Sequence, residues 1–274
     1  MTEEMIERKH QEDLQRIRGF RLLDDDFMTK VFDGNPESIQ LVLKIVMDIP
    51  DLTVIDVRTQ VFVENLLNRS VRLDVLAADS RGRRMNVEIQ RSDKGAGYKR
   101  ARFNSSMLDA GLLQKSEKFE ELPDIWVIFI TEHDIPGRGK AVYQVERRFA
   151  DTLEPFNDGS HILYVNGAYR DESPIGKLMH DFSCTNPADM NYGVLADRVR
   201  FFKESKEGVA IMCKAIEEMR LQERQEGRAE GRAEGLQEVA ANMLRAGKYA
   251  LEEIAALSGL SLDDVNALRA KLSL

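Results

Sequence analysis

The sequence of 274 residues has little cysteine and no long apolar run. Its two cysteines, Cys184 and Cys213, are too few for a disulfide scaffold or a cysteine-rich zinc site. No apolar stretch approaches the roughly 18 residues that suggest a transmembrane helix, so we expect no membrane association. The first 16 residues are charged and lack the apolar stretch of a signal peptide. Together these absences predict a cytoplasmic globular protein.

The sequence also lacks several motifs that identify enzyme classes. It has no GxGxxG, Walker A or GxSxG pattern, so no dinucleotide-binding, P-loop or serine-hydrolase chemistry is indicated. His180 and Cys184 have the i, i+4 spacing of a helical metal pair, but no second pair completes a tetrahedral site. Any chemistry must therefore rest on carboxylates.

Apolar periodicity and turn residues predict strands interspersed with helices. The stretch VRLDVLAADSRGRRMNVEIQ is typical of a β-hairpin with Gly82 in its turn. Within it, MNVEIQ (85–90) alternates, which places Glu88 and Gln90 on the polar face of a strand. We expect short helices from about residue 24 and from Pro36, a strand over 53–63, a helix over 98–113, strands over 125–131, 142–145 and 162–165, and helices from about residue 195.

Two carboxylates meet across this predicted hairpin. If the turn centres on Arg81, antiparallel partners sum to about 162, and Asp74 falls opposite or diagonal to Glu88. Directly opposed residues have Cβ atoms about 4.5–5.5 Å apart, so the two acids repel unless a cation lies between them. Mg²⁺ prefers carboxylate oxygens, and the pair therefore predicts a Mg²⁺-dependent hydrolytic site. The alternative is a solvated sheet face on which both acids pair with arginines.

Basic residues surround the acid pair. Residues 79–103 contain eight basic and three acidic residues, a local net charge of +5 in a protein whose total is -8. Basic side chains beside an acidic pocket suit a phosphodiester substrate, because they hold the backbone while the carboxylates hold the metal. We expect DNA contacts from Arg91, Lys99, Arg100 and Arg102. The helix that follows should extend this surface through Ser105, Ser106 and Asp109.

Asp74 followed by Glu88-Ile89-Gln90 resembles the D…(D/E)xK signature of PD-(D/E)XK nucleases, with Gln90 in the lysine position. Further segments resemble the recombination-promoting nuclease and transposase branch of that superfamily: DDFMTKVF, RLDVLAADSRGRRMNVEIQ, KRARFNSSMLDAGLL, LPDIWVIFITEHDIPG and SHILYVNGAYR. The resemblance runs from about residue 25 to about residue 203. It implies an α/β, restriction-endonuclease-like mixed sheet flanked by helices, and metal-dependent cleavage of DNA.

The resemblance also implies roles for individual residues. Asp74 and Glu88 would ligate Mg²⁺ or another divalent cation with the Ile89 carbonyl. Gln90 departs from the superfamily lysine; it is neutral and can only orient water or phosphate by hydrogen bonds. More of the water activation then falls to the metal. Asp26, from the first helix, is the candidate for a further catalytic acid, although it could equally cap that helix.

The C-terminal part has a different composition. The stretch EGRAEGRAEG (226–235) repeats with period four, so a helix would carry a glycine column, an arginine column and a glutamate column. A second copy of the helix could dock there and form a homodimer; the alternative is a flexible linker. Beyond it, LEEIAALSGLSLDDVNALRA is typical of a helix-turn-helix pair with Gly259 at the turn and Ser261 as an N-cap. Two aspartates at the start of the second helix favour a packing or oligomerisation role over reading DNA.

The chain is therefore expected to contain four segments. These are a polar, mobile lead-in over 1–20, a nuclease-like domain over 21–205, a glycine-rich helical linker or dimer helix over 206–235, and a small all-helical appendage over 236–274. The leading hypothesis is a Mg²⁺-dependent DNA endonuclease acting in recombination or mobile-element movement. One alternative is a degenerate nuclease fold that binds DNA or a partner without cutting. Another is an enzyme held inactive until its C-terminal helices assemble.

Overall fold

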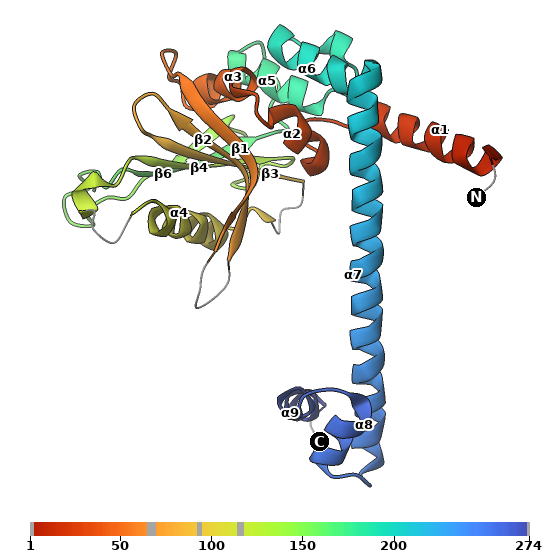
Figure 1. The fold of residues 1–274 in the computed structure, drawn as a ribbon. Helices are drawn as coiled ribbons and strands as arrows, with labels where there is room; N and C mark the ends of the chain where they lie inside the picture. The colour runs from red at the N-terminus through yellow and green to blue at the C-terminus, as the bar shows by residue number, and fades with distance from the viewer. Residues whose placement is uncertain (1–2, 65–69, 92–94, 114–117, 273–274) are drawn as a thin grey trace. The chain divides into compact units, whose positions relative to one another are not determined.

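The computed structural model describes residues 3–64, 70–91, 95–113 and 118–272 (Figure 1). Lys94, one of the eight basic residues counted over 79–103, lies outside this described part of the chain. The chain divides into two compact units, Met1–Cys213 and Lys214–Leu274. Each unit is described by itself below.

Helices make up most of the described elements. Their bounds are α1 Glu3–Gly19, α2 Asp25–Phe32, α3 Pro36–Val46, α4 Tyr98–Leu112, α5 Pro174–Ser183, α6 Gly193–Glu204, α7 Lys206–Ala246, α8 Leu251–Ser258 and α9 Leu262–Lys271, with short 3-10 turns at Phe119–Glu121 and Pro187–Asp189. No helix within the described ranges is long and apolar enough to cross a membrane.

The strands of the first unit form one mixed sheet. They are β1 Val54–Val63, β2 Val71–Asp79, β3 Arg84–Gln90, β4 Ile125–Thr131, β5 Val142–Val145 and β6 Ser160–Asn166. Their order is β1-β2-β3-β4-β6-β5; β3, β4 and β6 are parallel, and the remaining neighbours are antiparallel. Figure 1 shows α4 on one face of the sheet, with α3, α5 and α6 beyond the other. The predicted restriction-endonuclease-like α/β fold is confirmed.

Local chemistry explains why these elements form. Asn35 caps α3, since its side chain accepts a hydrogen bond from the Ser38 N–H at 3.0 Å, and Pro36 occupies the first turn. Gly82 takes φ +85° in the turn between β2 and β3, as the sequence predicted. β4 carries IWVIFIT and is buried along almost its whole length, because helices cover both of its faces.

The first segment of the chain, expected as a polar lead-in, is helical: residues Glu3–Gly19 form α1. Ile17 is 1% exposed within the first unit, and the exposed face carries the i, i+4 pair Arg8–Glu12 at 3.1 Å. Ile17 and a hydrogen bond from Lys203 Nζ to the Arg18 carbonyl at 3.0 Å join the end of this polar helix to the first unit.

The second unit is a small helical module. α7 is one continuous helix that includes the whole EGRAEGRAEG repeat. Ala240, Ile254 and Val265 form a core between the end of α7, α8 and α9. Gly259 ends α8 in the left-handed conformation, and the Ser261 side chain accepts a hydrogen bond from the Asp264 N–H. The predicted helix-turn-helix pair is present.

Candidate functional site

Asp74 and Glu88 lie on neighbouring strands at the point where regular pairing stops. β2 and β3 pair from Ala78↔Arg84 to Val75↔Val87, which is the register that the sequence predicted. One further step in this register places Asp74 opposite Glu88. The acid pair therefore occupies the first position beyond the antiparallel ladder, where side chains rather than backbone groups decide the contacts.

Asp74 is almost fully buried and poorly supplied with hydrogen-bond donors. It is 7% exposed, and its Oδ2 accepts a hydrogen bond from the Ile89 N–H at 3.0 Å. Burial first, and then the charges of Glu88 and Asp25, raise the pKa of Asp74 to about 8. The Ile89 N–H and the Arg100 charge act in the opposite direction. A carboxyl group in this position gives up its proton readily only when positive charge arrives.

Glu88 is completely buried but more firmly held. Its Oε1 accepts a hydrogen bond from Asn86 Nδ2 at 3.0 Å, and its Oε2 accepts one from Arg100 Nη2 at 3.0 Å. Burial raises the pKa of Glu88, and the bonds from Asn86 and Arg100 oppose that rise. Asn86 is itself buried, and its Oδ1 lacks a hydrogen-bond partner among the described atoms. Asn86 thus fixes the orientation of Glu88, a role that the sequence alone did not reveal.

Helix α2 contributes a third acid. After burial and the charge of Glu88, the charge of Asp25, at the first position of α2, also raises the pKa of Asp74. Its Oδ1 accepts a hydrogen bond from Gln60 Nε2 at 3.2 Å, and the same amide donates to Thr29 Oγ1 at 3.0 Å. Asp26, the acid chosen from the sequence, is the next residue, and both Asp25 and Asp26 are exposed. The structure thus shows that the neighbour of the expected residue acts on Asp74 through its charge.

Gln90 ends β3 with its side chain against a glycine. A Cβ added at Gly95 would lie 1.8 Å from Gln90 Oε1 and 2.8 Å from its Cδ. No side chain larger than a hydrogen therefore fits at position 95 while the Gln90 amide stays in place. The missing side chain at Gly95 leaves room for that amide, two positions along the strand from Glu88.

The four basic residues expected to contact DNA have different surroundings. Arg100 is 42% exposed and reaches from α4 to Glu88, while Lys99 and Arg102 are exposed on the same helix. Arg91 pairs with Asp24 at 3.0 Å and with Glu132 at 3.4 Å, yet 59% of its side chain remains exposed. Arg100 is thus the basic residue among these that touches the acid pair.

The polar face predicted for the helix of Arg102 needs one correction. Ser105 is 6% exposed, and its hydroxyl lies 2.9 Å from that of Ser160 on β6. It therefore joins α4 to the sheet and takes no part in an outer surface. Ser106 is exposed, as expected, and its hydroxyl donates to the Arg102 carbonyl at 3.1 Å.

These residues fit a divalent cation. Asp74 and Glu88 are two buried carboxylates that share one arginine, and a cation between them would allow both to ionise. The N–H and C=O of a strand residue point to the same side of the strand. Since the Ile89 N–H faces Asp74, the Ile89 carbonyl faces the same side and can add a third oxygen. Oxygen donors suit a hard cation such as Mg²⁺.

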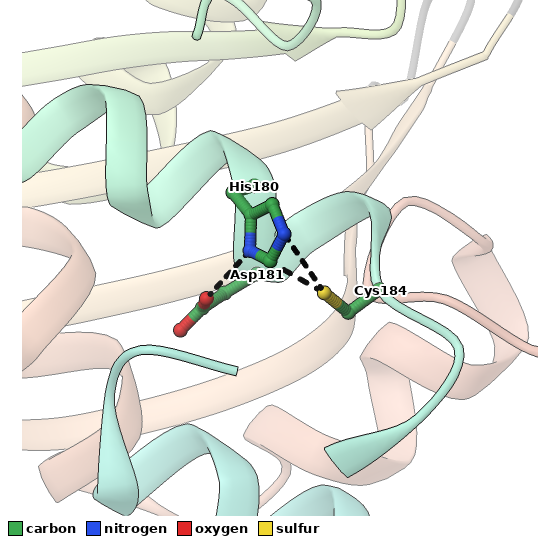
Figure 2. Close-up of side chains that lie close together, drawn as sticks. All are labelled: His180, Asp181 and Cys184. Carbon is green, nitrogen blue, oxygen red and sulfur yellow. Dashed lines mark hydrogen bonds and ion pairs between the residues drawn. The ribbon is translucent and has the colours of Figure 1, made fainter. Parts of the chain in front are cut away.

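A second group of metal-type ligands lies in the same unit. The ligand atoms of His180, Asp181 and Cys184 lie within 4.8 Å of one another. Figure 2 shows the three side chains close together. Asp181 is fully buried, and its oxygens already accept the Asn191 N–H at 2.7 Å, the Asn191 Nδ2 at 2.8 Å and the Tyr192 N–H at 2.8 Å. These bonds hold the segment that leads into α6. We therefore interpret this group as a structural one.

Comparison with known proteins gives one match. Residues 37–168 match the sequence model of a family described as PD-(D/E)XK nuclease family transposase. The matched range contains Asp74, Glu88, Gln90 and Arg100, and it ends before α5. No curated protein and no solved structure matches the chain.

Proposed function

We propose, from the premise that residues 37–168 belong to the PD-(D/E)XK nuclease family transposases, that this protein is a divalent-cation-dependent DNA endonuclease. The family match supports a nuclease or transposase-like role. The observation that carries the proposal is the buried pair Asp74 and Glu88, whose pKa values are both raised, chiefly by burial. Two buried carboxyl groups side by side can both ionise only when a cation balances their charge.

The pair and its surroundings assign a task to each residue. Asp74, Glu88 and the Ile89 carbonyl hold the cation, which when bound lowers the pKa of water and neutralises charge on the scissile phosphate. Asn86 keeps Glu88 in its orientation through the bond to Oε1. Gln90 has no charge and no titratable proton, so it orients water or a phosphate oxygen through its amide. Asp25 or its neighbour Asp26 supplies a further acid from α2.

Arg100 has a second role beyond balancing charge. Its guanidinium donates to Glu88 through one nitrogen and keeps part of its surface open to solvent. An arginine has five N–H donors, so the remaining ones can bind a phosphate oxygen beside the acids. Lys99, Arg102 and Arg91 are exposed nearby in sequence and would hold the flanking phosphates.

The continuous helix α7 supports assembly as a homodimer. Gly227, Gly231 and Gly235 form one column, and nothing in the structure lies within 4 Å of the point where a Cβ would stand. Each glycine costs a lone helix about 1 kcal/mol relative to alanine. A second copy would offset that cost, since arginine and glutamate columns can pair and the glycines permit close approach. Two catalytic units could then act on one DNA molecule.

The direct test is a cleavage assay on supercoiled plasmid with Mg²⁺ or with EDTA. Wild-type protein should nick or cut only with Mg²⁺, and Glu88→Ala should remove the activity. Activity that survives both Asp74→Ala and Glu88→Ala would reject the site assignment. Gln90 in the lysine position favours one alternative, a fold that binds DNA without cutting. Metal-independent DNA binding with no cleavage by the intact protein would establish that alternative.

Assembly is tested separately by deleting residues 224–274. The full chain should have the mass of a dimer in solution, and the deletion should have the mass of a monomer. If the deletion variant is a monomer and also cleaves DNA more slowly than the full chain, activity depends on assembly. If the full chain is itself monomeric at micromolar concentration, the proposed dimer helix is rejected, whereas the cleavage assay remains valid.

A further inference from the structure

Gln60 has an unusual backbone for a residue inside a strand. It lies in β1 with φ +53°, in the left-handed region that side chains other than glycine seldom adopt. Local strain of this kind persists only when the surrounding structure enforces it, and it is concentrated at functional sites. Gln60 therefore needs an explanation from its contacts.

The unusual conformation coincides with an interruption in the sheet. β1 and β2 pair at Thr59↔Val75 and again at Val61↔Leu73 with the same offset, and the described ladder skips the position between them. That position is shared by Gln60 and Asp74. No residue is inserted, so the strands resume their register after a single unpaired step.

Side-chain alternation changes at the same place. Leu73 belongs to the core cluster under α4, and Leu76 packs against that same cluster. Two residues three apart face opposite sides of a regular strand. β2 therefore changes its alternation between them, and Asp74 lies in the segment where it does so. The deviation at Gln60 and the displacement of Asp74 from regular pairing are thus one structural event.

The side chain of Gln60 connects this event to α2. Its amide nitrogen donates to Asp25 Oδ1 at 3.2 Å and to Thr29 Oγ1 at 3.0 Å. Asp25 and Thr29 are one turn apart on α2, so both bonds fix the helix as well as the carboxylate. A bond that serves only to attach the helix would need no left-handed residue next to Asp74.

We propose that Gln60 is a positioning residue: its left-handed backbone opens the sheet at Asp74, and its amide holds Asp25 beside the Asp74–Glu88 pair. It acts on the cation through Asp25 and does not touch the cation itself. The inference rests on the proposed function for the identity of the ligand. It adds a residue from β1 to a site otherwise built from β2, β3 and two helices.

The test measures divalent cation binding by calorimetry with Mn²⁺ and Mg²⁺ on the full chain, without DNA. Gln60→Gly accepts φ +53° freely but lacks the amide. The thermal midpoint of this variant should equal or exceed that of wild type, while its affinity for the cation should fall about tenfold, as is typical when a partner of a metal ligand is removed. Gln144→Gly on the edge strand β5 is the matched control and should bind the cations with wild-type affinity. In cleavage, Gln60→Gly should need more Mg²⁺ for half-maximal rate, with little loss at saturating Mg²⁺.

A double-mutant cycle guards against a general effect on folding. Asp25→Asn and Gln60→Ala should each weaken cation binding, and the double variant should be no weaker than Asp25→Asn alone. Additive losses, or unchanged affinity in Gln60→Gly, would overturn the inference. A loss of thermal midpoint in step with affinity would also overturn it, because the role would then be structural. If wild-type protein binds neither cation, the proposed function itself falls.

Discussion

Asp181 and the Asp74–Glu88 pair are buried acids of the same compact unit, but they differ in the donors that surround them. Asp181 receives two backbone N–H groups and a side-chain amide at 2.7–2.8 Å. Asp74 receives one backbone N–H at 3.0 Å and faces two other carboxylates, those of Glu88 and Asp25. The carboxyl groups of both sites are buried, so burial alone does not distinguish them.

The difference lies in what each carboxylate lacks. A carboxylate whose oxygens accept several N–H hydrogen bonds connects two segments of the chain, and these bonds already stabilise its charge. Asp74 accepts one backbone N–H and lies beside the carboxyl group of Glu88, so it keeps its proton until a cation balances the pair. The donors to Asp181 and the carboxyl neighbour of Asp74 therefore separate a structural acid from a candidate metal ligand, although the residue types at the Asp181 cluster look more like a metal site.

The largest contrast is expected in cleavage. Asp74→Asn removes the charge that a cation needs and should lower plasmid cleavage by at least about 10³-fold, equivalent to about 4 kcal/mol. Asp181→Asn should leave cleavage per folded molecule unchanged, because Asp181 only ties the start of α6. The measurement is nicking in Mg²⁺, normalised to the folded fraction from circular dichroism. Equal losses in both variants would remove the distinction between the two sites.

In the free energy of unfolding we expect a substitution at Asp181 to have a large effect, although it has none on cleavage. Asp181→Ala removes the buried acceptor of the Asn191 and Tyr192 backbone N–H groups and of the Asn191 amide, and should lower the free energy of unfolding by about 3 kcal/mol. Asp197→Ala is the control, because Asp197 forms an exposed ion pair with Arg200 at 2.6 Å and such pairs contribute little. Urea denaturation followed by circular dichroism compares them. A value for Asp181→Ala close to that of the control would show that its donors find other acceptors.

The pH dependence of stability should sharpen the contrast further. The pKa of Asp74 rises on folding from 3.8 to about 8, so the folded state holds a proton that the unfolded state has released. The metal-free protein should therefore lose stability as pH increases from about 4 to about 8, by an amount of the order of a few kcal/mol. Asp74→Asn should lack this loss and be more stable than wild type at pH 8, and Mg²⁺ should offset the loss in wild type.

Thermal midpoints of both proteins at pH 5, 6, 7 and 8, with and without Mg²⁺, measure this effect. If wild type and Asp74→Asn lose stability in parallel, the titrating group is another residue. If Mg²⁺ leaves the wild-type curve unchanged, the pair does not take up that ion.

The smallest predicted effect concerns Gln90 and its glycine. Gly95→Ala forces the Gln90 amide to move and should lower the cleavage rate about tenfold, or about 1.4 kcal/mol. Gly97→Ala is a close control, since nothing lies within 4 Å of its added methyl group. Initial cleavage rates at saturating Mg²⁺ compare the two. Similar rates for both variants would mean that the position of the Gln90 amide is unimportant.

The sequence was sufficient for the hairpin that carries the acid pair. Alternation in MNVEIQ and the turn glycine set both the face and the register, because these depend on neighbours within twenty residues. The buried strand β4 and the N-terminal proline of α3 were predictable for the same reason. Local pattern thus fixed the position of Glu88 relative to β2.

Other features depend on contacts between distant segments. Whether Asp25 or Asp26 faces Asp74 depends on the rotation of α2 above β1, and one residue along a helix changes direction by about 100°. Ser105 was predicted to be a surface residue, but its hydroxyl contacts that of Ser160, 55 positions away in the sequence. The donors to Asp181 come from a loop ten residues later, which no spacing rule identifies. Such contacts require the folded chain.

The left-handed backbone at Gln60 has a consequence for large-scale mutagenesis. A selection for cellular abundance should reward glycine at position 60, because glycine adopts φ +53° without strain. A selection for cleavage at limiting Mg²⁺ should reject the same substitution. Position 60 would then stand out as a place where the two selections rank one variant in opposite directions, which marks it as a residue retained for chemistry at the expense of folding.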